Sequence, residues 1–476
     1  MKKYLNKLSL LLLAAVFSFT ACDTVDFGDT NVNPNSPSDA STALLLTNAQ
    51  KTVSGYIAST TANLYVQYLS NGQYDEESRY QTLNWNPNYG VITNINRIIE
   101  LNEGADTKVA AQANGSNANQ VAVAKLLKSY YFSIMTDRWG MLPFSEANKG
   151  LENPFPKYDS QQAIYDGIFA MIDSALSGMD SGNGPAGDIL FGGDMAQWTK
   201  FANTLKMTMA LKLSKADATK GAAKFLESYN KGISSASGNL QYTYLSEDAN
   251  DNPWQDRFES RRDYLMSDTF VNKMIGTGTS TAPQDPRLPM MADVSNNTLE
   301  YVGAPYGASN STVDNYSWIT KNIIFKGDAP LMIFTYAEVC FARAEAAAMG
   351  WTTEDAATWY AAGIQASMDQ WGVAAADATT YAGSKPYTNV DDIAYERWVA
   401  QFLQGYNSWS EWRRAKAMGT DGHIALVAPA SLVNGTDIPQ RHGYSATAGS
   451  LNKDNYDAAV AAQGPDNLDT IIWLFK

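Results

Sequence analysis

The chain has 476 residues, of which 45% are hydrophobic and only 18% are charged, and its formal net charge is −14. A chain of this length can bury a sizeable core, but its acidic balance disfavours nucleic acid and other anionic partners, which bind to clustered lysines and arginines. A zinc site needs a cluster of cysteines or histidines, and the chain has only Cys22, Cys340, His423 and His442. A nucleophilic triad needs a histidine as base, and both histidines lie in turn-like segments. Glycine-rich phosphate-binding motifs are also missing from the sequence. We therefore expect no metal, no cofactor and no nucleophilic catalysis.

The first 21 residues have the pattern of a targeting signal. Three lysines and no acidic residue precede an apolar run, Leu8 to Phe19. This run is too short to span a bilayer, which needs about 20 residues. The small residues Thr20 and Ala21 then precede Cys22, an order that resembles a lipoprotein cleavage site. The sequence predicts lipidation of Cys22, the alternative being an ordinary secretory signal followed by a chance cysteine.

The mature chain is predicted to consist of a tether and one large domain. Residues 22–40 are rich in Asp, Asn, Ser and Pro, a composition that cannot bury enough apolar surface to fold. Residues 41–476 are expected to form a single helical domain. Residues 236–328 are rich in Gly, Asn, Pro and Tyr and are predicted to be a loop-rich insertion with one modest helix, from Ser267 to Met274.

Hydrophobic periodicity predicts helices along most of the domain, beginning with Leu44 to Leu69 and Ile92 to Leu101. Later helices can be grouped into antiparallel pairs of about forty residues, as in tetratricopeptide repeats. The predicted pairs are 121–136 with 160–178, 198–214 with 222–232, 331–349 with 354–371, and 391–404 with 409–418. We therefore predict an all-α fold, a superhelix of tetratricopeptide-like hairpins decorated with long irregular loops.

The third pair contains the most apolar helix of the chain. Asp328-Ala329-Pro330 is a helix-start signal, and Gly350 is a typical helix end. Thr353 is the expected cap of the second helix of the pair.

Two carboxylates, Glu338 and Glu345, lie in this apolar helix and need partners if they are buried. Seven residues of helix rise about 10.5 Å, which is longer than the carboxylate separations of glycosidases, about 5–9.5 Å. This spacing favours structural ion pairs, with Arg413 and Arg414 as the expected partners.

Several motifs in this order resemble one protein family. They include Trp139-Gly140-Met141-Leu142-Pro143, Phe201-Ala202-Asn203-Thr204-Leu205-Lys206, Tyr336-Ala337-Glu338-Val339 and Tyr360-Ala361-Ala362-Gly363-Ile364. Together they resemble the SusD/RagB family of outer-membrane nutrient-binding lipoproteins, and its SusD-like branch in particular. Each motif is weak alone, and their shared order over nearly the whole mature chain carries the assignment.

The resemblance implies a surface-exposed lipoprotein, anchored to the outer membrane by Cys22, that partners a SusC-like TonB-dependent transporter. Asp23, Asp26 and Asp29, close to the anchor, imply export to the cell surface. Such a protein captures oligosaccharide and passes it on without catalysis. One alternative is a RagB-like protein that binds peptide. A less favoured alternative is a surface glycoside hydrolase, for which Asp256 and Glu259 are a candidate pair, closer in sequence than Glu338 and Glu345.

Aromatic residues interleaved with amides and charged groups mark three polar loops. A flat ring can cover the C–H face of a sugar, while neighbouring polar groups satisfy its hydroxyls. We expect these rings to be exposed, the alternative being that they hold the loops together. The predicted ligand-binding residues are Trp85, Trp254, Tyr74, Tyr80, Tyr301, Tyr306, Trp318 and Arg257. A charged peptide would depend more on Arg257 and Arg261.

Overall fold

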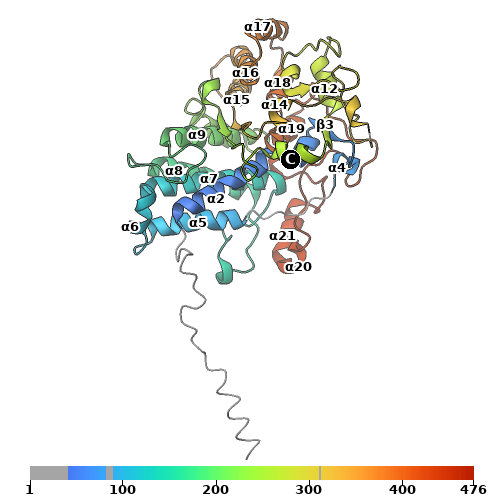
Figure 1. Cartoon of the computed structure of the whole chain (residues 1–476). Coiled ribbons are helices and arrows are strands. Elements are labelled where there is room, and N and C mark those ends of the chain that lie inside the picture. Colours follow the sequence, from blue (N-terminus) through green and yellow to red (C-terminus); the bar gives the residue numbers. More distant parts are fainter. Residues whose placement is uncertain (1–40, 82–88, 310–311) are drawn as a thin grey trace, which may run out of the picture. The chain divides into compact units, whose positions relative to one another are not determined.

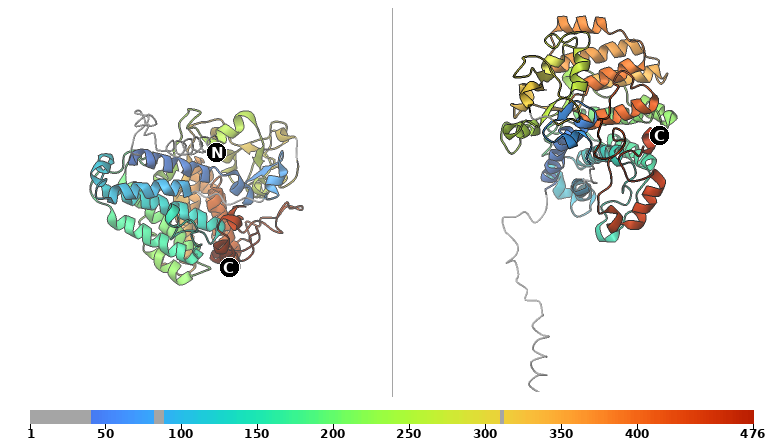
Figure 2. Two further views of the ribbon diagram at one scale, coloured as in Figure 1. Left: turned by 90° about the horizontal axis from the view of Figure 1, so that it is seen from below. Right: turned by 90° about the vertical axis from the view of Figure 1, so that its right-hand side faces the viewer.

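Packed helices form the first half of the domain in the computed structural model, which describes residues 41–81, 89–309 and 312–476. Cys22, the tether and Trp85 lie outside these residues. In this half α2 packs on α5, α5 on α7 and α7 on α8, and Figure 2 shows them side by side in chain order. Their bounds are Thr42–Ile57 for α2, Tyr89–Glu103 for α5, Asn117–Trp139 for α7 and Gln161–Gly178 for α8.

Two further hairpins follow the predicted pattern. Helix α9 (Met195–Lys212) packs against α10 (Ala218–Leu226), and α15 (Tyr336–Ala348) packs against α16 (Ala356–Trp371). Helix α18 (Val390–Ala400) contacts both α15 and α19 (Gly405–Met418). The four predicted helix pairs are therefore present, and the predicted all-α fold of tetratricopeptide-like hairpins is confirmed.

The start of the central helix was predicted wrongly. Residues Leu331–Phe334 form strand β6, which pairs antiparallel with β2 (Leu240–Tyr242). The helix begins at Tyr336, because the Thr335 side chain caps it by accepting from the backbone N–H of Glu338. A run of four apolar residues suits a strand as well as a helix, and only the partner strand decides between them. The next cap is Asp355 rather than Thr353.

The remaining short elements connect the hairpins and build the loop-rich side of the domain. Two more antiparallel pairs occur, β1 (Leu69–Asn71) with β3 (Tyr264–Met266) and β4 (Ala292–Asp293) with β5 (Trp318–Ile319). The other α-helices are α3 Thr60–Tyr65, α4 Asp75–Ser78, α6 Lys108–Ala111, α11 Pro253–Ser260, α12 Asp268–Ile275, α13 Leu288–Met291, α14 Lys321–Ile324, α17 Ala375–Ser384, α20 Ala448–Leu451 and α21 Lys453–Gln463. Short 3-10 helices cover Gln112–Asn114, Gly150–Glu152, Ala236–Gly238, Val313–Asn315 and Trp473–Phe475.

Residues 236–328 are therefore more ordered than predicted, because the expected single helix, α12, is accompanied by α11, α13 and α14. Helix α11 has a start signal that the prediction overlooked. Asn252 accepts from the backbone N–H of Trp254, and Pro253 occupies the first helical position, where it has no N–H to lose.

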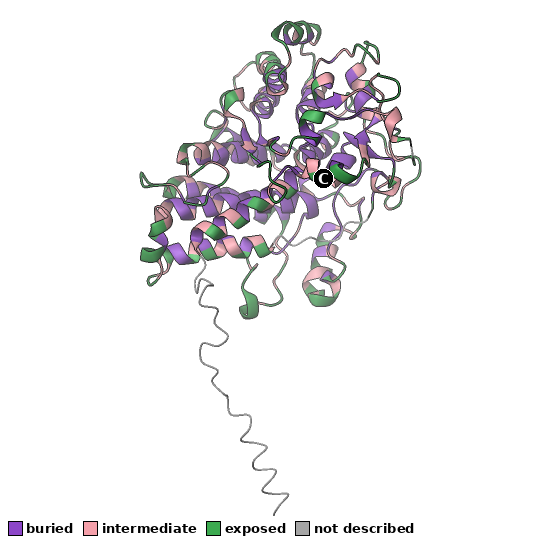
Figure 3. Ribbon diagram, viewed as in Figure 1, coloured by how far each residue is buried: buried purple, intermediate pink, exposed green. Residues whose placement is uncertain are grey.

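A buried network of charges joins α15, α18 and α19. Glu345 accepts two hydrogen bonds from Arg414, at 2.6 and 2.7 Å, and lies 2.8 Å from a guanidinium nitrogen of Arg397. Glu411 lies 2.7 Å from both of these arginines. The predicted structural ion pairing of Glu345 is present, and Figure 3 shows these helices at the buried centre of the domain.

The other predicted partners in this network were wrong. Arg413 donates to the carbonyl oxygens of Trp409, Gln440 and Asp137 rather than to a carboxylate. Glu338 accepts a hydrogen bond from Gln401 at 3.4 Å, and no ion pair of Glu338 occurs among residues 41–81, 89–309 and 312–476. The two glutamates of one apolar helix are therefore held in different ways.

Candidate ligand-binding surface

Three polar segments far apart in the sequence lie side by side. Strand β1 pairs with β3 through Leu69–Met266 and Asn71–Tyr264, and the backbone N–H of Met266 donates to the Ser317 carbonyl at 3.0 Å. Figure 1 shows α4, β3 and α12 at the right-hand side, opposite α6, α8 and α9. We define residues 72–80, 254–264, 301–309 and 312–318 as the aromatic-loop surface.

The most accessible ring of this surface is Tyr74, whose exposed fraction is 37%. Arg261 donates to the Tyr74 hydroxyl at 2.7 Å, and its guanidinium carbon lies 5.6 Å from the ring centroid. The two side chains therefore form an exposed pair that combines a flat apolar face with several hydrogen-bond donors.

A second arginine–ring pair lies on the same surface. The guanidinium carbon of Arg262 is 4.1 Å from the ring centroid of Trp318, and one of its nitrogens is 3.6 Å from Asp314. Arg262 covers the Trp318 ring, which is only 6% exposed. The exposure predicted for Trp318 is therefore wrong. The group that faces outward over this ring is the Arg262 guanidinium.

Carboxylates complete the edge of the surface. Glu77 accepts from the Tyr264 hydroxyl at 2.9 Å and from the Asn71 amide at 3.0 Å. Burial and the Glu77 carboxylate raise the pKa of Tyr264 to about 12, so its hydroxyl stays protonated and can donate. Burial also raises the pKa of Asp263, while the neighbouring Arg261 opposes that shift. Because both signs of charge are present, the surface suits a ligand with many hydroxyls and no large charge.

Trp254 contradicts the exposure predicted for it, because its side chain is fully buried. In α11 Trp254 and Phe258 lie one turn apart and both face the interior. The Trp254 ring contacts Tyr264 edge-on at 6.3 Å, and the Arg257 guanidinium carbon lies 4.9 Å from its centroid. Arg257 is half-buried, and this burial lowers its pKa.

Tyr80 was also predicted to be exposed, and it too is fully buried. Its ring contacts Tyr65 at 5.4 Å and Tyr306 at 6.3 Å, and burial raises its pKa to about 12. Tyr306 is half-buried and donates to the Leu64 carbonyl, and Tyr301 is also half-buried. Several of the predicted rings therefore hold the loops together.

Two residues of the surface were missed from the sequence, Arg262 and Glu77. The signal for Arg262 was the Arg261-Arg262 pair directly before a strand, where successive side chains point to opposite sides. Glu77 carried no signal of its own, since its importance comes from the pairing of β1 with β3.

The candidate catalytic carboxylates also lie on this surface. Asp256 and Glu259 are exposed on α11, and Glu259 accepts from Gln255 at 2.7 Å. Among the described residues, no group of His, Cys, Asp and Glu is arranged to hold a metal ion. Likewise, none of the helices in the described part of the chain has the length and hydropathy needed to cross a bilayer.

Known proteins resemble this chain in sequence and in fold. Residues 34–445 match a protein family described as starch-binding and associating with the outer membrane. A solved chitin-binding protein superposes with a TM-score of 0.79 at 23% identity, covering 91% of this chain and 99% of that one. A SusD homologue from Bacteroides fragilis gives 0.79 at 19% identity, with 92% and 100% coverage. A SusD homologue from Bacteroides thetaiotaomicron gives 0.72 at 20% identity, with 92% and 99% coverage. No curated protein matches the chain.

Proposed function

The chain belongs to the SusD-like family of starch-binding proteins that associate with the outer membrane, and we propose from this premise that it captures neutral oligosaccharides as nutrients. The observation that carries the proposal is the exposed Tyr74–Arg261 pair on the aromatic-loop surface. Its ring can stack on the C–H face of a sugar, and its guanidinium can donate to hydroxyls. Trp85, close by in the sequence, is proposed as a second stacking residue.

The remaining steps of the proposed function follow from the family. The protein would hand its ligand to a SusC-like TonB-dependent transporter and would perform no catalysis itself. Glycan turnover tests the latter point. Incubation with maltooligosaccharides or chitooligosaccharides should release no new reducing ends, whereas a surface glycoside hydrolase would release them.

Replacing Tyr74 by alanine is expected to weaken oligosaccharide binding about tenfold, because a stacked ring contributes about 1 kcal/mol or more beyond simple contact. The melting temperature should hardly change, since the ring is exposed. Calorimetric titration with maltoheptaose and chitohexaose measures the effect, and Trp85→Ala is expected to behave in the same way. Phe155→Ala is the matched control, because Phe155 is 61% exposed and its carbonyl is held by Asn455 of α21.

A peptide ligand is the second candidate, and the exposed arginines favour it. Arg261 and Arg262 are both exposed on the aromatic-loop surface. An acidic peptide would bind mainly through these charges and would dissociate as salt is raised. A neutral glycan should bind almost independently of salt, and Tyr74→Ala should then matter more than Arg261→Ala. The opposite ranking, together with strong salt dependence, would assign the surface to peptides.

We also propose that the protein is anchored to the outer membrane by lipid on Cys22 and is exposed at the cell surface. Replacing Cys22 by alanine should leave the protein soluble or uncleaved, because the thioether-linked lipid can no longer form. Membrane fractionation of cells expressing wild type and Cys22→Ala measures this. Cys340→Ala is the control, since Cys340 is buried in α15. Unchanged membrane association of Cys22→Ala would contradict the anchor.

A further inference from the structure

A pocket of about 180 Å³ lies beside the end of α16 and shares none of its lining residues with the aromatic-loop surface. Its walls are mostly apolar, with Leu331, Met332, Trp371 and Phe402 among them. Pockets that enclose whole drug-sized ligands measure about 300–1,000 Å³. A volume of this size therefore fits one ring of a ligand rather than a whole chain.

The pocket borders a wider groove. The two hollows share Met332 and Gln370, and the groove adds about 710 Å³ between the start of α9, strand β2 and the end of α16. Polar side chains line this groove, including Gln197, Asn239, Gln241 and Thr243. A chain-like ligand can therefore place one end unit in the pocket while its following units lie along the groove.

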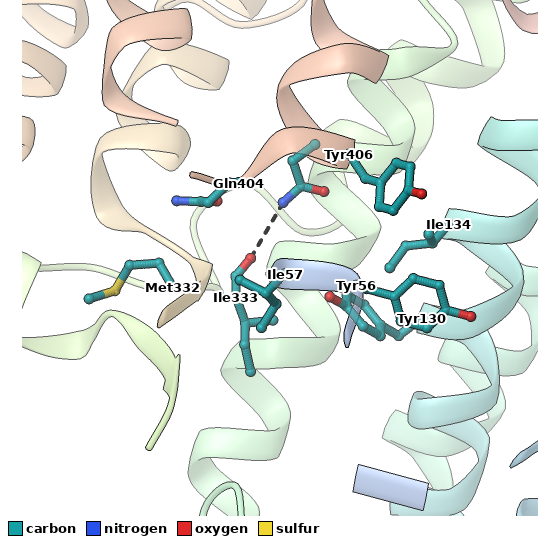
Figure 4. Close-up of a pocket in the computed structure, with 9 residues that line it drawn as sticks. Tyr56, Ile57, Tyr130, Ile134, Met332, Ile333, Gln404 and Tyr406 are labelled. Atoms are coloured by element: carbon teal, nitrogen blue, oxygen red, sulfur yellow. Dashed lines mark hydrogen bonds between the residues drawn. The ribbon is translucent and has the colours of Figure 1, made fainter. Parts of the chain in front are cut away.

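Gln404 is the buried polar side chain among the described residues that line the pocket. It is only 5% exposed, and neither its amide nitrogen nor its amide oxygen has a hydrogen-bond partner within the described residues. Figure 4 shows its side chain on the same side as Met332, a residue that lines both the pocket and the groove. Gln404 and Met332 also border a cavity of about 10 Å³, which has room for no more than a water molecule. A buried amide without partners is costly, so a ligand that both donates and accepts would satisfy it.

The backbone beside Gln404 is strained. Leu403, which also lines the pocket, has a φ of 65°, in the left-handed region that non-glycine residues rarely adopt. Strain of this kind is often held at ligand-binding sites, where the surrounding structure fixes it.

Two further amides along the same path have oxygens without partners among the residues that the structure describes. They belong to Gln370, which lines both hollows, and Gln197, which lines the groove. The indole N–H of Trp371 in the pocket is also unpartnered within those residues. Donors and acceptors are thus spread along apolar walls, a pattern that matches the faces and hydroxyls of sugar rings.

Asp194 and Asp369 place two carboxylates in the groove, whereas the charges at the pocket favour a neutral ring in the pocket. Lys326 is the only charged residue that lines it among the described residues, and its ammonium lies 3.7 Å from Asp328. We propose that the Gln404 pocket and its groove form a second binding site, which takes one ring of a neutral oligosaccharide in the pocket and the next units in the groove. This proposal rests on the glycan-binding function proposed above.

Replacing Gln404 by leucine tests the second site. The variant removes the unpartnered amide at nearly constant volume, so its melting temperature should equal or exceed that of the wild type. Titration with maltoheptaose and chitohexaose should show two binding events for the wild type. Gln404→Leu should weaken one of them at least tenfold, and Tyr74→Ala should weaken the other.

Hydrogen exchange locates the second event. In the wild type the ligand should protect residues 331–334 and 402–404, and this protection should be lost in Gln404→Leu but kept in Tyr74→Ala. Gln112→Leu, a change of an exposed glutamine in a short 3-10 helix, is the matched control and should bind as the wild type does. If Gln404→Leu fails to fold, Gln370→Leu at the half-buried end of α16 replaces it. This variant should likewise weaken one binding event and lose the protection of residues 331–334 and 402–404.

The outcomes separate the two proposals. If neither glycan binds the wild type at all, the proposed glycan-binding function fails and the second site fails with it. A single binding event that needs Tyr74 and is unaffected by Gln404→Leu and Gln370→Leu would overturn only the second site. If peptides but not glycans protect residues 402–404, the second site does not bind oligosaccharides as proposed.

Discussion

Replacing Glu345 by glutamine is expected to lower the free energy of unfolding by about 3–5 kcal/mol, because the change leaves two buried arginines with Glu411 as their single counter-charge. Arg414 and Arg397 both contact this carboxylate and are themselves almost fully buried. Arg414 and Arg397 hold the pKa of Glu345 at about 2 against the opposing effect of burial. Thermal and denaturant unfolding at neutral pH measure the loss.

The stability contributed by Glu345 depends on pH. Since the folded-state pKa of Glu345 is depressed, its stabilising contribution is present above its unfolded pKa of about 4.5 and is lost as pH falls toward 2. The difference in stability between wild type and Glu345→Gln should therefore shrink in acid. A difference that stays constant down to pH 2 would show that the charge of Glu345 is not what stabilises the fold.

Glu338, on the same helix, is the internal comparison. Burial and the neighbouring Glu411 raise its pKa to about 7, so the ionised form destabilises the folded state as pH rises through the range from about 4.5 to 7. Glu338→Gln should therefore be nearly neutral at pH 5 and more stable than the wild type at pH 8. Asp457→Asn is the surface control, because its side chain is 54% exposed and exposed ion pairs contribute about 0–1 kcal/mol.

Replacing Trp254 by alanine is expected to destabilise the domain by about 3–5 kcal/mol, the usual cost of removing a large buried aromatic side chain. The ring is fully buried, and its loss leaves a cavity beneath Arg257 and Tyr264. Denaturant unfolding followed by circular dichroism measures the effect. Any loss of ligand affinity in this variant should follow from movement of the aromatic-loop surface, because α11 supports Arg261 and Tyr264.

Tyr74→Ala provides the contrast on the same surface. Its ring is partly exposed, so affinity should fall while stability is kept, the reverse of the order expected for Trp254→Ala. Trp254→Phe should recover most of the stability, since it keeps an aromatic ring in the core. If the Trp254→Ala protein melts like the wild type but no longer binds glycan, Trp254 contacts the ligand, as predicted from the sequence.

The boundaries of the central hairpin show how far local patterns reach. Periodicity and Gly350 correctly predicted a buried helix followed by a second one that ends before Gly372. The same patterns extended the first helix into Leu331–Phe334, which became strand β6 because Leu240–Tyr242 was available to pair with it. A short apolar run has no preference of its own strong enough to decide between helix and strand.

Some features of the candidate site could also be predicted from the sequence, and others could not. Aromatic composition selected three segments that the fold does bring together, but it could not tell an exposed ring from a buried one. Tyr74 remained accessible, whereas Trp254 turned inward because the Asn252-Pro253 cap started a helix with Phe258 on the same face. Gln404 carried no local signal, since an unpartnered amide is defined only by what surrounds it.

By itself, the sequence determined the all-α class, the four helix pairs, the family and the internal placement of Glu345, because each depends on periodicity or on motifs read along the chain. The tertiary structure alone decided that Arg397 joins the predicted Arg414 at Glu345 and that Arg413 does not. It also decided the burial of Trp254 and Tyr80 and the pocket beside Gln404. These features depend on contacts between residues that are far apart in sequence, such as Glu345 with Arg397 and Tyr80 with Tyr306. Local propensities do not predict such contacts, since burial and pairing are properties of the packed chain.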